Sequence, residues 1–155
     1  MRSKIATCLW LDGVAEEAAR FYVSLVPGSE LGPILRKEDG SALVVELSLG
    51  GTPYQLLDGG PSFELDEAAS IVVHTTSQAE TDRYWDALTS GGGRESRCGW
   101  CEDRFGVSWQ VVPESLYAFL SSSDRAAAAR AMEAMLKMSK IDMAAIESAF
   151  RGDRR

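Results

Sequence analysis

The sequence predicts an α+β fold in which two βαβββ modules form a cupped mixed sheet, followed by C-terminal helices. Three observations support this prediction. Strand-like and helix-like segments occur twice in the same order, the two copies match at an offset of 63 residues, and the last part of the chain has helical periodicity. We therefore expect a single domain over residues 1–155, with modules at 3–61 and 68–113 and a helical tail at 114–155.

The first module begins with the apolar run Ile5–Leu11, which predicts a strand. Apolar residues at helical spacing follow from position 15 to position 25; Asp12 is a candidate cap for this helix and Pro27-Gly28 can end it. The run Leu43–Leu49, the hairpin signal Gly50-Gly51 and the run at 54–57 predict the last two strands of the module.

The second module repeats this order from residue 70 onward. The run Ile71–Val73 predicts a strand, and Ser77 with Glu80 forms a capping box that opens a helix through Leu88. A short strand at 98–101, a turn at 103–106 and a strand at 107–112 complete the module. We interpret Asp103 as a turn-forming residue rather than a catalytic one, because Asp at the start of a turn with Gly at its fourth position is typical turn chemistry.

The tail predicts helices at 116–120, 124–138 and 142–150, with Asp124 and Asp142 as caps. Their apolar residues, Met135 among them, are expected to pack against a sheet edge or a subunit interface.

The composition of the chain argues against two classes of partner, nucleic acids and membranes. A net charge of −7 over 155 residues repels phosphate backbones, so we expect no nucleic-acid partner. No segment has the roughly 20 consecutive apolar residues of a membrane span, and the N-terminus has no apolar signal core, so we expect no membrane partner and a cytoplasmic location. The three cysteines, Cys8, Cys98 and Cys101, fit reduced thiols, and with one histidine in the chain a zinc site is short of ligands.

Several fragments in order resemble one family. They are Cys8–Gly13, Leu57–Pro61, Asp82–Trp85, Cys98–Trp100, Asp103–Gln110 and Lys140–Asp142. Over roughly 140 residues this pattern is similar to the PhnB-like family of the vicinal oxygen chelate superfamily, which includes glyoxalases, bleomycin resistance proteins and dioxygenases. The resemblance implies a glyoxalase-like cup of paired modules and, commonly, a homodimer.

The resemblance also implies where a metal would bind. In metal-using relatives the ligands come from the first and last strands of each module, and carrying these positions over gives the set Thr7, Gln55, Ser70 and Gln110. These neutral oxygen donors suit a transition metal poorly, since such metals prefer imidazole, thiolate or carboxylate. We therefore expect no metal and no cofactor.

The remaining candidates concern a ligand. Alternation along the strand places His74 on the face of Ser70, which makes it a weak acid/base candidate, although a solvated histidine at a strand end is the simpler interpretation. Tyr54 and Trp100 are candidates for lining a pocket. By the same alternation Trp10 and Trp109 are expected to point away from the cup, towards the helices, while Trp85 belongs to a helix face; all three are expected in the core. No Asp or Glu is expected on the inner face of the cup.

These residues favour a metal-independent protein that binds an apolar or aromatic small molecule in the cup, through Thr7, Tyr54, Gln55, Ser70, His74, Trp100 and Gln110. A metal-dependent lyase or dioxygenase, a protein similar to demethylubiquinone methyltransferases, and a scaffold dimer without a ligand remain alternatives. The sequence leaves open whether the protein is an enzyme.

Overall fold

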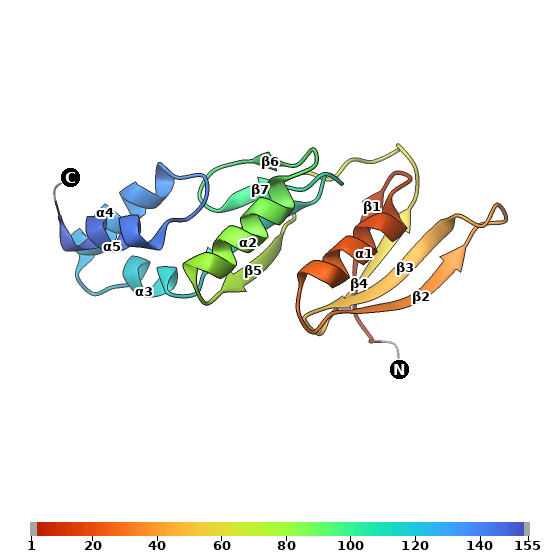
Figure 1. The fold of residues 1–155 in the computed structure, drawn as a ribbon, viewed down its shortest axis with the longest axis horizontal. Helices are drawn as coiled ribbons and strands as arrows, with labels where there is room; N and C mark the ends of the chain where they lie inside the picture. Colours follow the sequence, from red (N-terminus) through yellow and green to blue (C-terminus); the bar gives the residue numbers. More distant parts are fainter. Residues whose placement is uncertain (1–2, 154–155) are drawn as a thin grey trace. The chain divides into compact units, whose positions relative to one another are not determined.

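The computed structural model describes residues 3–153 and contains two compact units, the first ending at Asp66 and the second beginning at Glu67 (Figure 1). The boundary falls in the predicted segment between the two modules. The prediction that both modules form one domain stays a prediction.

The first unit has the order β1 (Thr7–Leu11), α1 (Ala15–Leu25), β2 (Glu30–Arg36), β3 (Ala42–Leu49) and β4 (Thr52–Asp58). Its sheet has the strand order β1-β4-β3-β2, with β1 parallel to β4 and the other pairs antiparallel. Helix α1 lies across one face of this sheet (Figure 1).

The core of the first unit lies between α1 and that face. It consists of small residues and one tyrosine from α1 together with alternate residues of the strands: Ala15, Ala18, Ala19, Tyr22, Leu25, Leu9, Leu11, Val45, Leu47, Leu49 and Leu56. The predicted cap Asp12 is wrong, because the residue before α1 is Val14, which makes no side-chain cap. The turn is held instead by Asp58, whose carboxylate accepts a hydrogen bond from the backbone N–H of Gly13.

The second unit repeats this topology with β5 (Ile71–Thr75), α2 (Gln78–Thr89), β6 (Arg94–Glu95), β7 (Trp100–Glu102) and β8 (Ser108–Pro113), in the strand order β5-β8-β7-β6. The predicted cap is confirmed, since Ser77 Oγ accepts from the backbone N–H of Glu80 at 3.1 Å. Trp85 and Trp109 are buried, as predicted. The two four-stranded mixed sheets with their helices confirm the predicted α+β fold of paired βαβββ modules.

Three further helices follow: α3 (Leu116–Leu120), α4 (Arg125–Leu136) and α5 (Met143–Arg151). The predicted caps are confirmed, because Asp124 and Asp142 accept hydrogen bonds from the backbone N–H groups of Ala127 and Ala145. These helices share an apolar cluster with β8 that includes Val112, Leu116, Ala131, Ile141 and Ile146.

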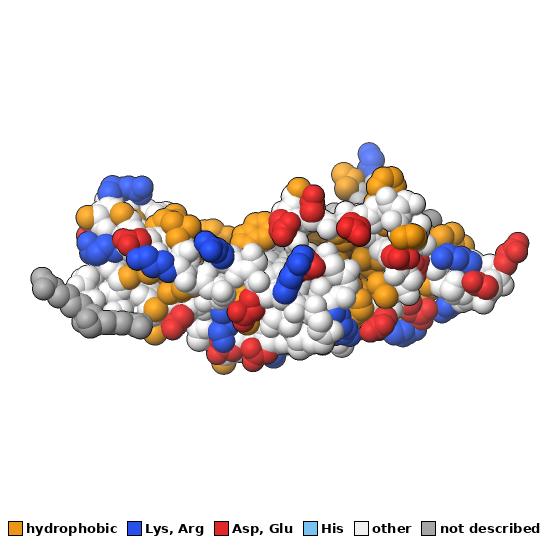
Figure 2. Space-filling model, turned by 90° about the horizontal axis from the view of Figure 1, so that it is seen from above, with side chains coloured by type: hydrophobic (Ala, Val, Ile, Leu, Met, Phe, Trp, Pro, Cys, Tyr) orange, Lys and Arg blue, Asp and Glu red, His pale blue; other side chains and the backbone are white. Residues whose placement is uncertain are grey.

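The helices between residues 3 and 153 are all too short or too polar to cross a membrane. On the face drawn in Figure 2, acidic and basic side chains are interspersed rather than gathered into one basic patch.

Candidate functional site

The side of the first sheet opposite α1, which we call the open face, carries a row of polar side chains. Val45, Leu47 and Leu56 are buried beneath α1, so the residues that alternate with them project from the open face. Gln55 of β4 is in register with Cys8 of β1 on one side and with Glu46 of β3 on the other. A thiol, an amide and a carboxylate therefore stand side by side on three neighbouring strands.

The next row along the strands is apolar. Leu57 is in register with Trp10 on one side and with Val44 on the other, and Val44 is in register with Leu35 of β2. The indole Nε1 of Trp10 donates to the carbonyl oxygen of Gly60 at 2.8 Å. The prediction that Trp10 points towards the helix is wrong, because it shares the open face with Gln55.

Two adjoining hollows lie on the open face. The larger, of about 570 Å³, is bordered by the start of the described chain and by β2, β3 and β4, including Tyr54 and Gln55. The smaller hollow, of about 370 Å³, is bordered by Gln55 and by five residues of β2 and β3. Glu46 and Pro33 border both. Glu46 was missed by the prediction that no acidic residue lies on this face. Its alternation with the apolar Val45 and Leu47 was the available signal.

The structure places Thr7 differently from the prediction. Thr7 is in register with Tyr54 and alternates with Cys8, so it lies on the side of α1 and Cys8 takes the place opposite Gln55. The linker between strand and helix is Asp12–Val14 in the first unit and one residue shorter, Thr76–Ser77, in the second. The offset of 63 residues therefore holds for the helices, whereas the first strands match at 64.

The corresponding row in the second unit is Val72, Gln110 and Trp100. Ser70 lies beside this row, and its Oγ accepts a hydrogen bond from Nε2 of Gln110 at 2.9 Å. His74 is exposed at the end of β5, and its Nε2 lies 3.5 Å from the hydroxyl of Tyr117. The predicted residues Ser70, His74, Trp100 and Gln110 thus share one side of the second sheet.

The donor set of these rows does not fit a transition metal. Val72 holds the place opposite Gln110 that Cys8 holds opposite Gln55, and a hydrocarbon side chain cannot ligate an ion. Over residues 3–153, no three His, Cys, Asp or Glu side chains come together in an arrangement that could hold one. Cys101 is also a poor ligand, because burial raises the pKa of its thiol to about 12.

Asp103 belongs to the framework, in agreement with its interpretation as a turn residue. Its buried carboxylate accepts hydrogen bonds from the backbone N–H groups of Phe105 and Val107 and from Nε1 of Trp109, at 2.8, 3.1 and 2.8 Å. A carboxylate so occupied holds the β7–β8 turn and the core tryptophan together.

A family model and a solved structure that match this chain carry the same family description. Residues 3–112 match the model of the family described as 3-demethylubiquinone-9 3-methyltransferase. No curated protein matches. A PhnB protein from Bacillus cereus is 29% identical, with a TM-score of 0.66 over 72% of this chain and 99% of that one.

Two more distant structures share the fold. Protein PA1353 from Pseudomonas aeruginosa is 24% identical, with a TM-score of 0.62 over 73% of this chain and 98% of that one. A mutant of the fosfomycin resistance protein FosX from Listeria monocytogenes, complexed with Mn(II) and 1S,2S-dihydroxypropylphosphonic acid, is 13% identical, with a TM-score of 0.53 over 72% and 93% of the chains.

Proposed function

Because the chain belongs to the PhnB-like family whose model is described as 3-demethylubiquinone-9 3-methyltransferase, we propose that it binds a small organic molecule on the open face of the first sheet without a metal. The observation that carries this proposal is the pair of adjoining hollows: Glu46 and Gln55 of the polar row border both, and Val44 and Leu35 of the apolar row border the smaller one. Their volumes, about 570 and 370 Å³, lie in the range of ligand sites.

The side chains of the open face favour an amphipathic ligand. Trp10, Val44 and Leu57 offer apolar contact, while Gln55 offers both a hydrogen-bond donor and an acceptor. In this proposal Cys8 replaces Thr7 among the predicted contact residues. Tyr54 is retained because it borders the larger hollow, although its position on β4 alternates with that of Gln55.

Taken by itself, the second unit keeps Ser70, His74, Trp100 and Gln110 as proposed ligand-contacting residues on one side of its own sheet. A homodimer and a cytoplasmic location are also part of the proposal. Metal independence rests on Val72, which takes a ligand position with a side chain that has no donor atom.

We propose binding in preference to methyl transfer because of the residues in the two strand-to-helix turns. The turns from a parallel strand to the following helix are Asp12-Gly13-Val14 and Thr76-Ser77. Neither is glycine-rich, as a turn that brings its backbone close to a nucleotide cofactor would be.

The test is elemental analysis of the purified, unchelated protein, followed by thermal scans with Mn²⁺, Zn²⁺ and Mg²⁺. We expect no stoichiometric metal and no stabilisation by any ion. A stoichiometric metal that raises the melting temperature would contradict metal independence. A screen of aromatic fragments against ¹⁵N-labelled protein then tests binding, and we expect shifts at residues 44–57. Shifts confined to the second unit would contradict the assignment to the open face.

A further inference from the structure

Glu46 is the acidic residue at the centre of the proposed site. It lies between Val45 and Leu47, both buried under α1, and is itself half-buried on the opposite side. Its Cα partner on β4 is Gln55. A carboxylate in this position is partly removed from water, which strengthens its interaction with an opposite charge.

The neighbouring strand is irregular at the same point. Strand β2 pairs Leu31 with Leu47 and Ile34 with Val45, so Gly32 and Pro33 together stand opposite Glu46 in a β-bulge. A Cβ atom on Gly32 would lie 2.9 Å from the carbonyl oxygen of Glu46, so the close approach of the two strands requires glycine. Bulges of this kind leave a residue outside the strand pairing and are frequent beside binding sites.

The hollows differ in polarity on the two sides of Glu46. Apart from Glu46 and Gln55, which border both hollows, the residues of the smaller one are apolar: Pro33, Ile34, Leu35 and Val44. Among the described residues that border the larger one, the charged side chains are the carboxylates of Glu46 and Glu30 and the ammonium of Lys4. An ionised carboxylate only accepts hydrogen bonds, so a ligand head that donates them fits this border best.

From this geometry we infer that Glu46 determines ligand specificity: the site takes a molecule with a positively charged, hydrogen-bond-donating head, such as a primary ammonium, and an apolar body. The head binds Glu46 and the side-chain oxygen of Gln55, and the body lies in the smaller hollow over Leu35 and Val44. This inference rests on the proposed function, because it names the ligand class of the same site.

Three probes of similar size and different head groups test it: 2-phenylethylammonium, 2-phenylethanol and 3-phenylpropionate. Each is titrated into the ¹⁵N-labelled full-length protein at pH 7, and the dissociation constant is taken from the backbone shifts. We expect the ammonium to bind about tenfold more tightly than the alcohol, the size of a charge-assisted hydrogen bond, and the carboxylate to bind more weakly than both.

Variants assign the preference to Glu46. In Glu46→Gln the ammonium should bind no more tightly than the alcohol, whose own affinity should stay within about twofold. Glu38→Gln removes the same charge from the exposed β2–β3 hairpin of the same unit and should keep the tenfold preference. Gly32→Ala is a second, independent variant, and it should weaken all probes because the added Cβ displaces the backbone of Glu46.

The outcomes separate the two ideas. If the probes shift residues 44–57 but bind equally well, or the carboxylate binds best, the inference about Glu46 is overturned and the binding site stands. A preference for the ammonium that survives in Glu46→Gln also overturns it. If no probe shifts these residues in the folded wild-type protein, the inference fails together with the proposed site.

Discussion

The two sheets have the same strand order and pairing but different side chains in the middle row. Gln55 and Gln110 hold equivalent places, each on the last strand of its unit. In the first unit the amide is flanked by a thiol and a carboxylate, whereas Val72 and Trp100 flank it in the second. The βαβββ scaffold therefore fixes the position of the amide and leaves the chemistry around it to the neighbouring strands.

A second difference concerns how the amide is used. Gln110 donates to Ser70, while the residue in the place of Ser70 in the first unit is Ala6, which has no hydroxyl and borders the larger hollow. The tail adds a third difference. Gln78, the first residue of α2, binds two backbone groups of the tail, and the equivalent first residue of α1 is Ala15.

The largest effect is expected in one of the two hairpin turns, because the two turns are stabilised in different ways. The β3–β4 turn uses Gly50 and Gly51 at positive φ, whereas the β7–β8 turn depends on the buried carboxylate of Asp103. Replacing this residue, Asp103→Ala, leaves three donors without their acceptor, and we expect a loss of about 3–5 kcal/mol in the free energy of unfolding, measured by urea denaturation. The control Asp39→Ala, on an exposed turn, should cost under about 1 kcal/mol. Equal losses would contradict the structural role of Asp103.

The segment after each last strand gives the next test. The backbone N–H of Gly59 donates to Leu11, as that of Glu114 donates to Thr75, so the two positions are equivalent. A Cβ atom on Gly59 would lie 2.3 Å from the ring of Trp10. We expect Gly59→Ala to cost about 2–3 kcal/mol through overpacking and to shift the Trp10 indole N–H resonance. Glu114→Ala should cost about 0.5 kcal/mol or less. A neutral Gly59→Ala would show that the ring moves freely.

A smaller effect is expected where the tail is fastened to α2. The side chain of Gln78 donates to the carbonyl oxygen of Ile141 and accepts from the backbone N–H of Met143, both at 3.0 Å. We expect Gln78→Ala to lower the free energy of unfolding by about 1–2 kcal/mol. The amides of Cys98 and Gly99, which donate to carbonyl oxygens at 138 and 139, should exchange faster with deuterium.

The control for this loss is Asp82→Asn, which removes the charge of an exposed ion pair with Lys140 but keeps a side-chain oxygen to accept from Nε2 of Gln78, and it should change stability by less than about 0.5 kcal/mol. Unchanged exchange at Cys98 in Gln78→Ala would mean that the tail is held by its apolar cluster alone.

Local signals in the sequence were sufficient for most elements of the fold. The caps Ser77, Asp124 and Asp142 depend on residues three positions apart, and the structure has all of them. The site depends on pairing between distant strands. A single residue of difference between two linkers moved Thr7 to the other side of the sheet, because a shift of one residue exchanges the two faces of a strand.

The position of the bulge opposite Glu46 could not be predicted from the sequence either, because it too depends on strand pairing. Gly32-Pro33 indicates an irregular strand, but which residue stands opposite is set by the register of β2 on β3. Only that register connects the glycine with Glu46.

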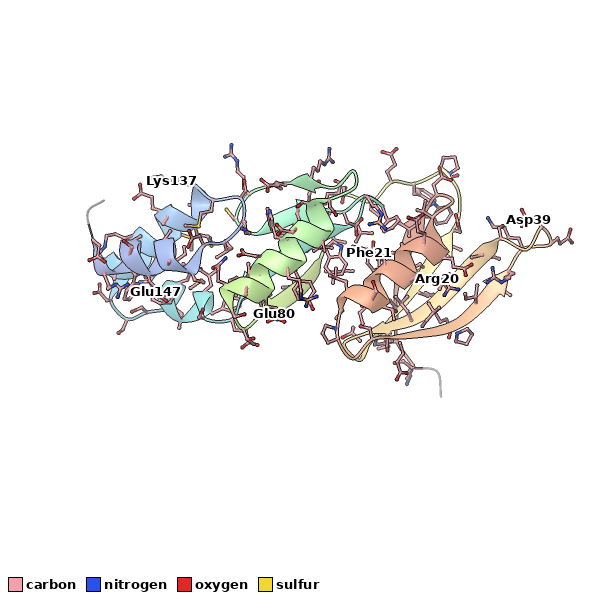
Figure 3. All side chains as sticks on the ribbon, viewed as in Figure 1. Arg20, Phe21, Asp39, Glu80, Lys137 and Glu147 are labelled. Atoms are coloured by element: carbon pink, nitrogen blue, oxygen red, sulfur yellow. The ribbon has the colours of Figure 1, made fainter. Side chains whose placement is uncertain are left out.

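The smallest effect on stability is expected from an ion-pair cluster of the first unit. Glu16 on α1 forms ion pairs with Arg36 at 2.9 Å and with Arg20, labelled in Figure 3, at 2.7 Å. The residue equivalent to Glu16 in the second unit is Ala79, which has no charge. Hydrogen bonds from Arg36 and Arg20 lower the pKa of Glu16 to about 2. A carboxyl titration by NMR should find this midpoint.

The sign of the pH dependence follows from that shift. Because the pKa of Glu16 is lower in the folded state, the cluster stabilises the protein fully above the unfolded pKa of about 4.3, and this contribution is lost as the pH falls through about 2. The small stability difference between wild type and Glu16→Gln should therefore vanish over this range. It should also shrink in 1 M salt, because the charges are exposed. A difference that persists in acid and in salt would assign the effect of the substitution to packing of the side chain instead of its charge.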